Sequence, residues 1–473
     1  MAPWKCAVGL VFSLAIFVGL VAILGGPTES DSTTSIYSTW AIAHGSLSCA
    51  YPRANILAAP LYPLLSGGLV ALLRIGSHTA FPTVAQLGPH CSSAVVAIGK
   101  WSFRAHAWQR TLQVGDLSWL ALAGGVVALL RTTERGRRGW EPFTLVLLGV
   151  SLPVLMPLVE DFHPQDILAM GLTIAALAYA RRGSWTWAGL FVGLAFTSQQ
   201  FAVLMAVTLF TLAPSGRRLR FTSAALGVVG VVGLPLVILS SGRAVRSVFV
   251  GTGLSPSIGR TVLSVTGLHG TVLTDVSRIM PILAALGVAL WAKRRFGPSV
   301  LEAEFLMSLL AAALCLRLVF ELNIWGYYFM PLCVGLVVLD VIRGRVRGVT
   351  IAWIAMVTLV FNPVLFYQFA TGQSYGLGPF RALQIVFLAV GLLLVVLDVL
   401  RRRIRWYLIA WCAVAAVSFA LDGWMYGPPH TAFPLWLWQI ALLSTAMWLI
   451  AGPIWAQLRA RDHSLTSGEL STS

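Results

Sequence analysis

The segment Glu160–Asp166 is an island of ionisable residues between two apolar stretches of the chain. It places three carboxylates and one imidazole within seven residues, although the whole chain of 473 residues has only 17 acidic side chains. In a chain that is 58% hydrophobic, with a mean hydropathy of +0.82, charged groups are expected in water-facing loops or at functional sites. The segment therefore indicates a site.

Three chemical roles are open for this segment. Glu160 or Asp161 could serve as a general base, or the carboxylates and His163 could supply oxygen and nitrogen ligands to a divalent cation. The third role is to hold a substrate, with His163 and Asp166 as contacts. A purely structural alternative is that Asp161 caps the following helix, with Pro164 in its first turn.

A second candidate group lies near residue 320. Arg317 falls in the last turn of an apolar helix, four residues before Glu321, and suits either an internal ion pair or a bound phosphate. Tyr327 and Tyr328 follow and could stack on a sugar, although aromatic residues also line membrane interfaces without a ligand. Weaker phosphate candidates are the arginines of the 242–278 loop: Arg243, Arg246, Arg260 and Arg278.

The elements that must position these residues are membrane-spanning helices. Apolar runs of about 17–25 residues, each able to cross a hydrocarbon core of about 30 Å, recur along the whole chain. The expected runs are 6–26, 112–130, 142–159, 164–180, 185–213, 222–241, 279–292, 301–320, 326–342, 349–368, 380–400, 406–421 and 432–456. We interpret 185–213 as a hairpin of two short helices broken at 197–200. The prediction is an all-α integral membrane protein with about 14 helices, within a range of about 11–14.

The basic residues predict the topology. Seven clusters of arginine and lysine alternate with the apolar runs, and the positive-inside rule places all of them in the cytoplasm. They lie at 131–138, 181–182, 217–220, 293–295, 343–347, 401–405 and 459–461. Both termini are then cytoplasmic, while the loop 27–111 and the segment Glu160–Asp166 face outward. The net charge of +16 thus reports orientation rather than nucleic-acid binding.

The long first outer loop carries an apolar run of its own, 56–75. We interpret it as a juxtamembrane or re-entrant helix, and the alternative is a further crossing. Cys49 and Cys91 both fall in this loop, where a disulfide is a reasonable hypothesis. The remaining cysteines lie in apolar helices and are expected to be core residues: Cys6, Cys315, Cys333 and Cys412.

These features, in their order, resemble the GT-C glycosyltransferases, and among them the bacterial mannosyl- and arabinofuranosyltransferase group. The resemblance covers about residues 1–345. In the first outer loop it is carried by an acidic residue, an aromatic residue, a glycine and proline–tyrosine pairs. Two later segments carry the rest. The carrying residues are Asp31, Tyr37, Ala43–Gly45, Tyr51-Pro52, Ala59–Pro63, Ala188–Ala195, Arg317–Glu321 and Tyr327-Tyr328. One departure is that His163–Asp166 stands where the group has Gly-Gln-x-Asn, with Gln165 retained.

The resemblance implies the activity. Such enzymes move a sugar, here mannose or arabinofuranose, from a polyprenyl-phosphate donor to an envelope glycan or glycolipid at the outer face of the plasma membrane. It makes Asp31 the candidate base and Gln165 a candidate substrate contact. Phosphate is a good leaving group, so one base suffices and inversion is expected. The resemblance implies no definite cofactor, and a divalent cation is left open.

The domain organisation follows from the resemblance and the apolar runs. Residues 1–345 form the catalytic membrane core, 346–456 form further transmembrane helices, and 457–473 form a cytoplasmic tail that is expected to be disordered. The chain has no phosphate loop and no zinc-protease motif, so an ATP-driven pump or zinc protease is unsupported. The rival function is a transporter or lipid flippase, because such proteins also contain interrupted helices.

Overall fold

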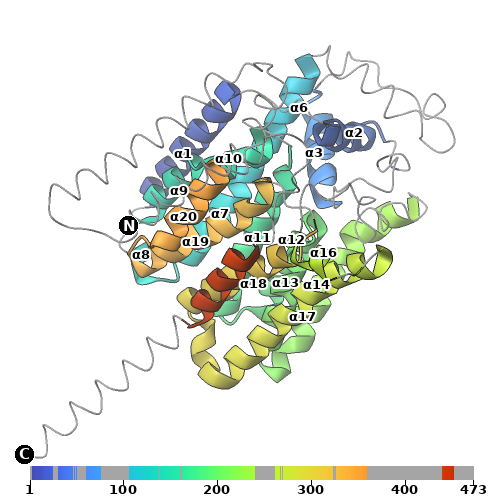
Figure 1. Ribbon diagram of the computed structural model, residues 1–473. Helices are drawn as coiled ribbons and strands as arrows, with labels where there is room; N and C mark the ends of the chain where they lie inside the picture. Colours follow the sequence, from blue (N-terminus) through green and yellow to red (C-terminus); the bar gives the residue numbers. More distant parts are fainter. Residues whose placement is uncertain are drawn as a thin grey trace, which may run out of the picture.

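The structure of the protein is a computed structural model. It describes residues 3–24, 30–45, 47, 50, 60–75, 106–137, 139–159, 162–239, 261–266, 268, 270–322, 326–359 and 439–451. Every regular element within these ranges is a helix, which confirms the all-α prediction (Figure 1). The expected helices at 380–400 and 406–421, the proposed Cys49–Cys91 bond and the 457–473 tail lie outside the described residues.

The helices form three groups along the chain. The helices around the first outer loop are α1 (Pro3–Leu24), α2 (Ser30–Ala43), α3 (Leu61–Leu72) and α6 (His106–Asp116). The central helices are α7 (Ser118–Leu130), α8 (Glu134–Arg137), α9 (Glu141–Gly149), α10 (Leu152–Val159), α11 (Pro164–Arg181), α12 (Trp185–Ser198) and α13 (Ala202–Leu212). The later helices are α14 (Ser215–Leu239), α16 (Val262–Val265), α17 (Gly270–Phe296), α18 (Ala303–Val319), α19 (Met330–Arg343) and α20 (Gly348–Leu359), with 3₁₀ turns η2 (Gly297–Leu301) and η3 (Gly326–Phe329) and a last helix at Gln439–Ala451.

Two of the expected apolar runs are broken in the structure. The run 185–213 divides into α12 and α13 because Gln199 adopts an extended backbone, φ −159° and ψ 142°, which confirms the predicted hairpin break. The run 142–159 was expected to be continuous, but it divides into α9 and α10 with a bend of 49°. Pro153 explains the second break, because proline lacks a backbone N–H and is favoured in the first turn of a new helix.

Four described helices have the length and composition to span a membrane. They are Arg110–Leu130, Ser215–Leu239, Val272–Leu301 and Gly326–Arg343, and the bent α9–α10 pair would be a fifth. Four further apolar helical segments in the described ranges are shorter, so the predicted total of about 14 stays a prediction: Ala7–Ala22 within α1, Leu61–Leu72, Ala202–Leu212 and Gln439–Ala451. The helix α3 has 12 residues, too few to cross about 30 Å at 1.5 Å per residue, which agrees with a juxtamembrane element.

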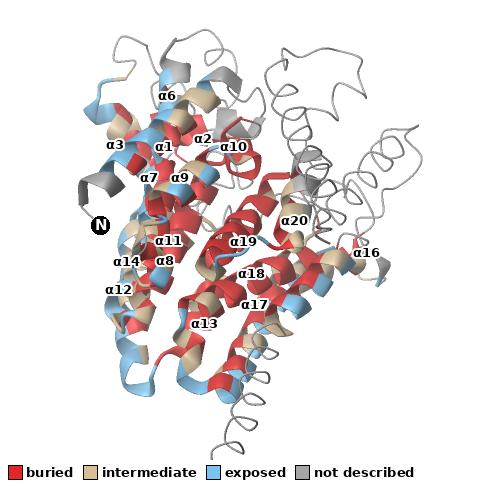
Figure 2. Cartoon of the chain, turned by 90° about the vertical axis from the view of Figure 1, so that its left-hand side faces the viewer, coloured by how far each residue is buried: buried red, intermediate tan, exposed pale blue. Residues whose placement is uncertain are grey.

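The core forms where α11 packs between α7 and α12 (Figure 2). Gly125 of α7 and Gly171 of α11 lie against the backbone of the opposite helix, where no Cβ atom would fit. Small residues at such crossings let two helices approach closely, as in other membrane proteins. Buried thiols at Cys315 and Cys333 confirm that these two cysteines are core residues.

The outward face of the bundle is apolar. On α14, which has no buried residue in its most apolar window, Leu226 and Val231 are 64% and 78% exposed. Large apolar side chains on α17, such as Ile279 and Leu283, are exposed as well. An exposed apolar surface of this extent is the face that lipid is expected to cover.

Ion pairs join the acids and arginines at the arginine-rich end of the bundle. Arg343 bonds to Glu304 at 2.6 Å, and Arg347 pairs with Asp340, the latter two side chains both buried. Acids at this end of the bundle therefore serve as partners of the arginines.

Candidate functional site

The helix α11 presents the second half of the acidic segment to the core. It begins at Pro164, with His163 in the N-cap position and no capping bond from its side chain. Pro164 in the first turn was predicted and is confirmed, but the N-cap position belongs to His163, so the alternative in which Asp161 caps this helix is wrong. The reason is that proline fixes φ for the first helical residue and so sets where the helix starts. Glu160 and Asp161 lie outside the described residues.

His163 and Gln165 are held together beneath an aromatic ring. The Gln165 amide nitrogen donates to His163 Nδ1 at 2.8 Å, which leaves the imidazole proton on Nε2. The imidazole stacks on Tyr327 of η3, with the ring centroids 4.1 Å apart and the planes inclined by 13°. Both side chains are buried, and Gln165 Oε1 has no hydrogen-bond partner among the described residues.

Arg317, at the end of α18, packs beside the aromatic rings of η3. Its guanidinium lies 5.0 Å from the ring of Tyr328, which contacts Tyr327 edge-on, and 5.6 Å from the ring of Phe201. The predicted ion pair with Glu321 is present, with 3.7 Å between Arg317 Nε and Glu321 Oε2. In the described part of the chain Arg317 donates no hydrogen bond, so its N–H groups are available to another acceptor.

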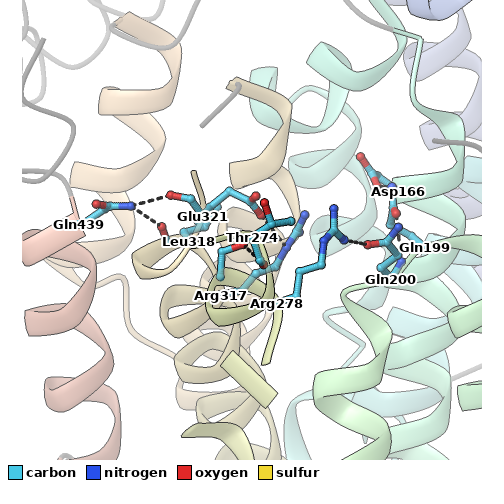
Figure 3. Close-up of polar contacts among 10 residues, drawn as sticks. Asp166, Gln199, Gln200, Thr274, Arg278, Arg317, Leu318, Glu321 and Gln439 are labelled. Carbon is cyan, nitrogen blue, oxygen red and sulfur yellow. Dashed lines mark hydrogen bonds and ion pairs between the residues drawn. The ribbon is translucent and has the colours of Figure 1, made fainter. Parts of the chain in front are cut away.

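The break between α12 and α13 supplies two residues that sequence reasoning missed. Gln199 donates to Asp166 at 2.5 Å, and Arg278 Nη1 of α17 donates to Gln200 Oε1 at 2.8 Å (Figure 3). The sequence did mark 197–200 as a polar break, but as an interruption rather than as a site. Buried Nε of Arg278 has no hydrogen-bond partner among the described residues.

Gln439 was also missed, and no sequence signal marks it. It joins the last described helix to the end of α18 by donating to the carbonyl oxygens of Glu321 (2.9 Å) and Leu318 (3.2 Å), and it accepts from Val262 N–H at 2.6 Å. Burial raises the pKa of Glu321 above its ordinary value, while Arg317 and then Arg278 oppose that rise. The carboxylate is thus held near two guanidinium groups.

The other predicted residues lie on the first-loop helices. Asp31 is in the first turn of α2, and Tyr37 is buried further along that helix. The helix α2 packs on α3, which in turn contacts α11 and α12. Among the described residues no three His, Cys, Asp or Glu side chains could together hold a metal ion. Because Glu160 and Asp161 lie outside the described residues, the divalent-cation hypothesis stays a prediction.

The fold and the site together define a class. This is a multi-helix membrane protein in which α11, the α12–α13 break, α17, α18 and η3 bring carboxylates, guanidinium groups and aromatic rings to one partly buried polar cluster. We call this set the polar cluster; its members are His163, Gln165, Asp166, Gln199, Gln200, Arg278, Arg317, Glu321, Tyr327 and Tyr328.

Residues 110–321 match the model of glycosyltransferase family 87, which agrees with the predicted resemblance to glycosyltransferases. The matched segment contains most of the polar cluster, whereas Asp31, Tyr37 and the two tyrosines of η3 lie outside it. A solved structure that resembles the chain is that of ArnT from Cupriavidus metallidurans bound to undecaprenyl phosphate, with a TM-score of 0.47, 14% identity, and coverage of 96% of this chain and 79% of that one. The curated proteins contain no match.

Proposed function

We propose that the protein transfers a sugar, mannose or arabinofuranose, from a polyprenyl-phosphate donor to a hydroxyl group of an envelope glycan or glycolipid at the outer face of the plasma membrane. The observation that carries the proposal is the presence of two arginines with unused donors, Arg278 and Arg317, within the segment that matches a glycosyltransferase family. Guanidinium groups bind phosphate oxygens in a planar, bidentate manner and do not lose their proton.

The reaction breaks the bond between the anomeric carbon and the phosphate oxygen. The acceptor oxygen attacks that carbon from the opposite face, so the configuration inverts, and the acceptor proton passes to a carboxylate. The leaving polyprenyl phosphate keeps the electron pair of the broken bond, and Arg278 and Arg317 would stabilise its charge. Asp31 is the proposed base, with Glu160 and Asp161 as the alternatives.

The aromatic rings of the cluster suit the sugar. The imidazole of His163 stacks on Tyr327, and Tyr327 contacts Tyr328 edge-on. Tyr328 in turn lies beside Arg317. A pyranose or furanose ring presents C–H groups that pack on such faces, while Gln165 Oε1, buried and unpartnered, could accept from a sugar hydroxyl. These residues, with Asp166, Glu321 and Tyr37, are the proposed substrate contacts.

The test uses the full-length protein in lipid nanodiscs with polyprenyl-phosphate mannose or polyprenyl-phosphate arabinofuranose, each labelled in the sugar, and an envelope-lipid extract as acceptor. We expect label to move to the acceptor with release of polyprenyl phosphate from one of the two donors. In sealed vesicles, movement of either donor across the bilayer without any transfer would instead support the transporter or flippase function.

A further inference from the structure

A second polar site lies on the other side of the turn formed by Phe162 and His163. While His163 stacks on Tyr327, the ring of Phe162 packs edge-on against Tyr62 of α3, with 6.4 Å between the centroids. Phe162 has φ +54°, in the left-handed region that non-glycine residues seldom adopt. Such strain persists where surrounding contacts hold it, and it is common near functional sites. These consecutive side chains therefore face two different sets of partners.

The hydroxyl group of Tyr62 is buried and unpaired. Tyr62 is 4% exposed, and its oxygen has no hydrogen-bond partner in the described ranges. Ser66, one turn along α3, bonds instead to the Tyr62 carbonyl oxygen at 2.9 Å and to Thr39 at 2.7 Å. A Cβ atom added to Gly115 would lie 3.3 Å from the Tyr62 hydroxyl and 2.8 Å from the Phe162 ring. The hydroxyl thus lies against the backbone just before Asp116.

Asp116, the residue after Gly115, is a buried acidic group whose charge acts on this donor. It ends α6, is 3% exposed, and makes no hydrogen bond or ion pair within the part of the chain that the structure describes. Burial, and after it the negative charge of Asp116, raise the pKa of Tyr62, so the phenol keeps its proton and remains a donor. A buried carboxylate and a buried hydroxyl, each without a partner, are unfavourable unless a ligand satisfies them.

We propose that Tyr62 and Asp116 form the subsite for the acceptor sugar and bind one of its hydroxyl groups. A sugar hydroxyl accepts one hydrogen bond and donates another, so its oxygen can accept from Tyr62 while its proton is shared with Asp116. The missing side chain at Gly115 lets the backbone approach the phenol and the Phe162 ring closely. The acceptor then lies on the Phe162 side of the turn, while the donor phosphate lies on the Arg317 side. This inference rests on the proposed function.

The first-loop helices hold this subsite in place. Trp40 of α2 donates to Thr111 of α6 at 3.1 Å, and the Thr39–Ser66 bond joins α2 to α3. The helix that carries the proposed base Asp31 is therefore fixed to both helices of the subsite. This arrangement suits a base that must meet an acceptor hydroxyl.

Kinetics with single-atom changes test the subsite. Tyr62→Phe removes only the hydroxyl, and Asp116→Asn keeps the shape of the side chain but removes its charge. With saturating donor, each is expected to raise the acceptor KM about 10-fold, and the donor KM is expected to stay unchanged. Tyr179→Phe is the matched control, because Tyr179 stacks on Phe191 and Trp187 near the arginine-rich end and should keep the parental acceptor KM. An acceptor KM that stays parental in both subsite variants overturns the proposal.

A binding measurement separates this proposal from the proposed function. Saturation-transfer NMR would be recorded on the parent in nanodiscs with methyl α-mannopyranoside or methyl α-arabinofuranoside and no donor. A signal that Tyr62→Phe weakens and Tyr179→Phe preserves supports the subsite, even if the parent transfers no sugar. A signal of equal strength in parent and Tyr62→Phe, or none from the parent with either glycoside, overturns it.

Thermal unfolding distinguishes a ligand site from a structural pair. Removing an unpaired buried charge by Asp116→Asn should leave the apparent unfolding temperature unchanged or raise it. A lower unfolding temperature together with unchanged acceptor KM would mean that Tyr62 and Asp116 hold only a buried water, which also overturns the subsite.

Discussion

Replacing Arg317 by glutamine tests whether this arginine binds the donor phosphate or only stabilises the end of its helix. The guanidinium packs on the rings of Tyr328 and Phe201, and each such contact at a partly buried position is worth about 0.5–1 kcal/mol. The ion pair with Glu321 spans 3.7 Å between side chains that are 19% and 28% exposed, and a pair of this kind adds no more than about 1 kcal/mol. Arg317→Gln should therefore lower the free energy of unfolding by about 2 kcal/mol.

The effect on the donor should be larger. A charge-assisted hydrogen bond to phosphate contributes about 1.5–3 kcal/mol, which corresponds to about a 10- to 100-fold rise in the donor KM. Arg317→Lys keeps the charge but loses the planar fork and its stacking, so its donor KM should lie between those of the parent and Arg317→Gln. The assay is sugar transfer in nanodiscs at varied donor and saturating acceptor, with thermal unfolding of each variant alongside.

A matched control exists at the arginine-rich end. The Arg182 guanidinium lies 5.6 Å from the ring of Tyr179 and donates to the Ala128 carbonyl at 3.1 Å, so Arg182→Gln loses comparable contacts far from the polar cluster. It should leave the donor KM at the parental value. If Arg317→Gln loses stability while its donor KM stays parental, Arg317 only fixes the helix end and the phosphate role is refuted.

Three further predictions concern stability, each measured as the apparent unfolding temperature in nanodiscs. Burial raises the pKa of Glu321 above 4.5, so the protonated side chain favours the folded state below that pH, and this contribution is lost as the pH rises through the folded-state pKa. The unfolding temperature of Glu321→Gln should therefore fall less steeply than that of the parent above pH 4.5. An equally steep fall in both proteins would contradict this prediction. Gly171→Ala places a Cβ against the α7 backbone and should destabilise by more than about 2 kcal/mol, whereas Gly227→Ala on α14, with open space around it, should be neutral or stabilising. Gln199→Ala removes the hydrogen bond to Asp166 and should lower the free energy of unfolding by about 1.5–3 kcal/mol. Adding Asp166→Asn in the same chain should partly offset this loss. If the effects of the two substitutions simply add, the hydrogen bond does not contribute to stability.

Local features of the site could be predicted from the sequence. The Arg317–Glu321 pair follows from i, i+4 spacing at a helix end, and the break before α13 follows from the polar residues inside an apolar run. The burial of Cys315 and Cys333 follows from their apolar surroundings. In each case neighbours within one or two turns decide the outcome.

The contacts that assemble the cluster could not be predicted in this way. His163 stacks on Tyr327, and Arg278 bonds to Gln200, across long separations that only helix packing closes. No periodicity within a helix reports which face meets which partner once nearly every face is apolar. The start of α11 at Pro164 agrees with the predicted run 164–180, but its N-cap residue was not predicted: Asp161 is a good capping residue, yet Pro164 places the N-cap position at His163.

The measurement that tests the central claim most directly is sugar transfer by the purified parent and by Asp31→Asn, with both labelled donors and the envelope-lipid acceptors. Asp275→Asn on α17 is the control, since Asp275 is exposed and has no partner in the described ranges. The account predicts transfer by the parent and by Asp275→Asn, and none by folded Asp31→Asn. Transfer by all three would move the base to Glu160 or Asp161, and the absence of transfer by the folded parent from either donor would contradict the account.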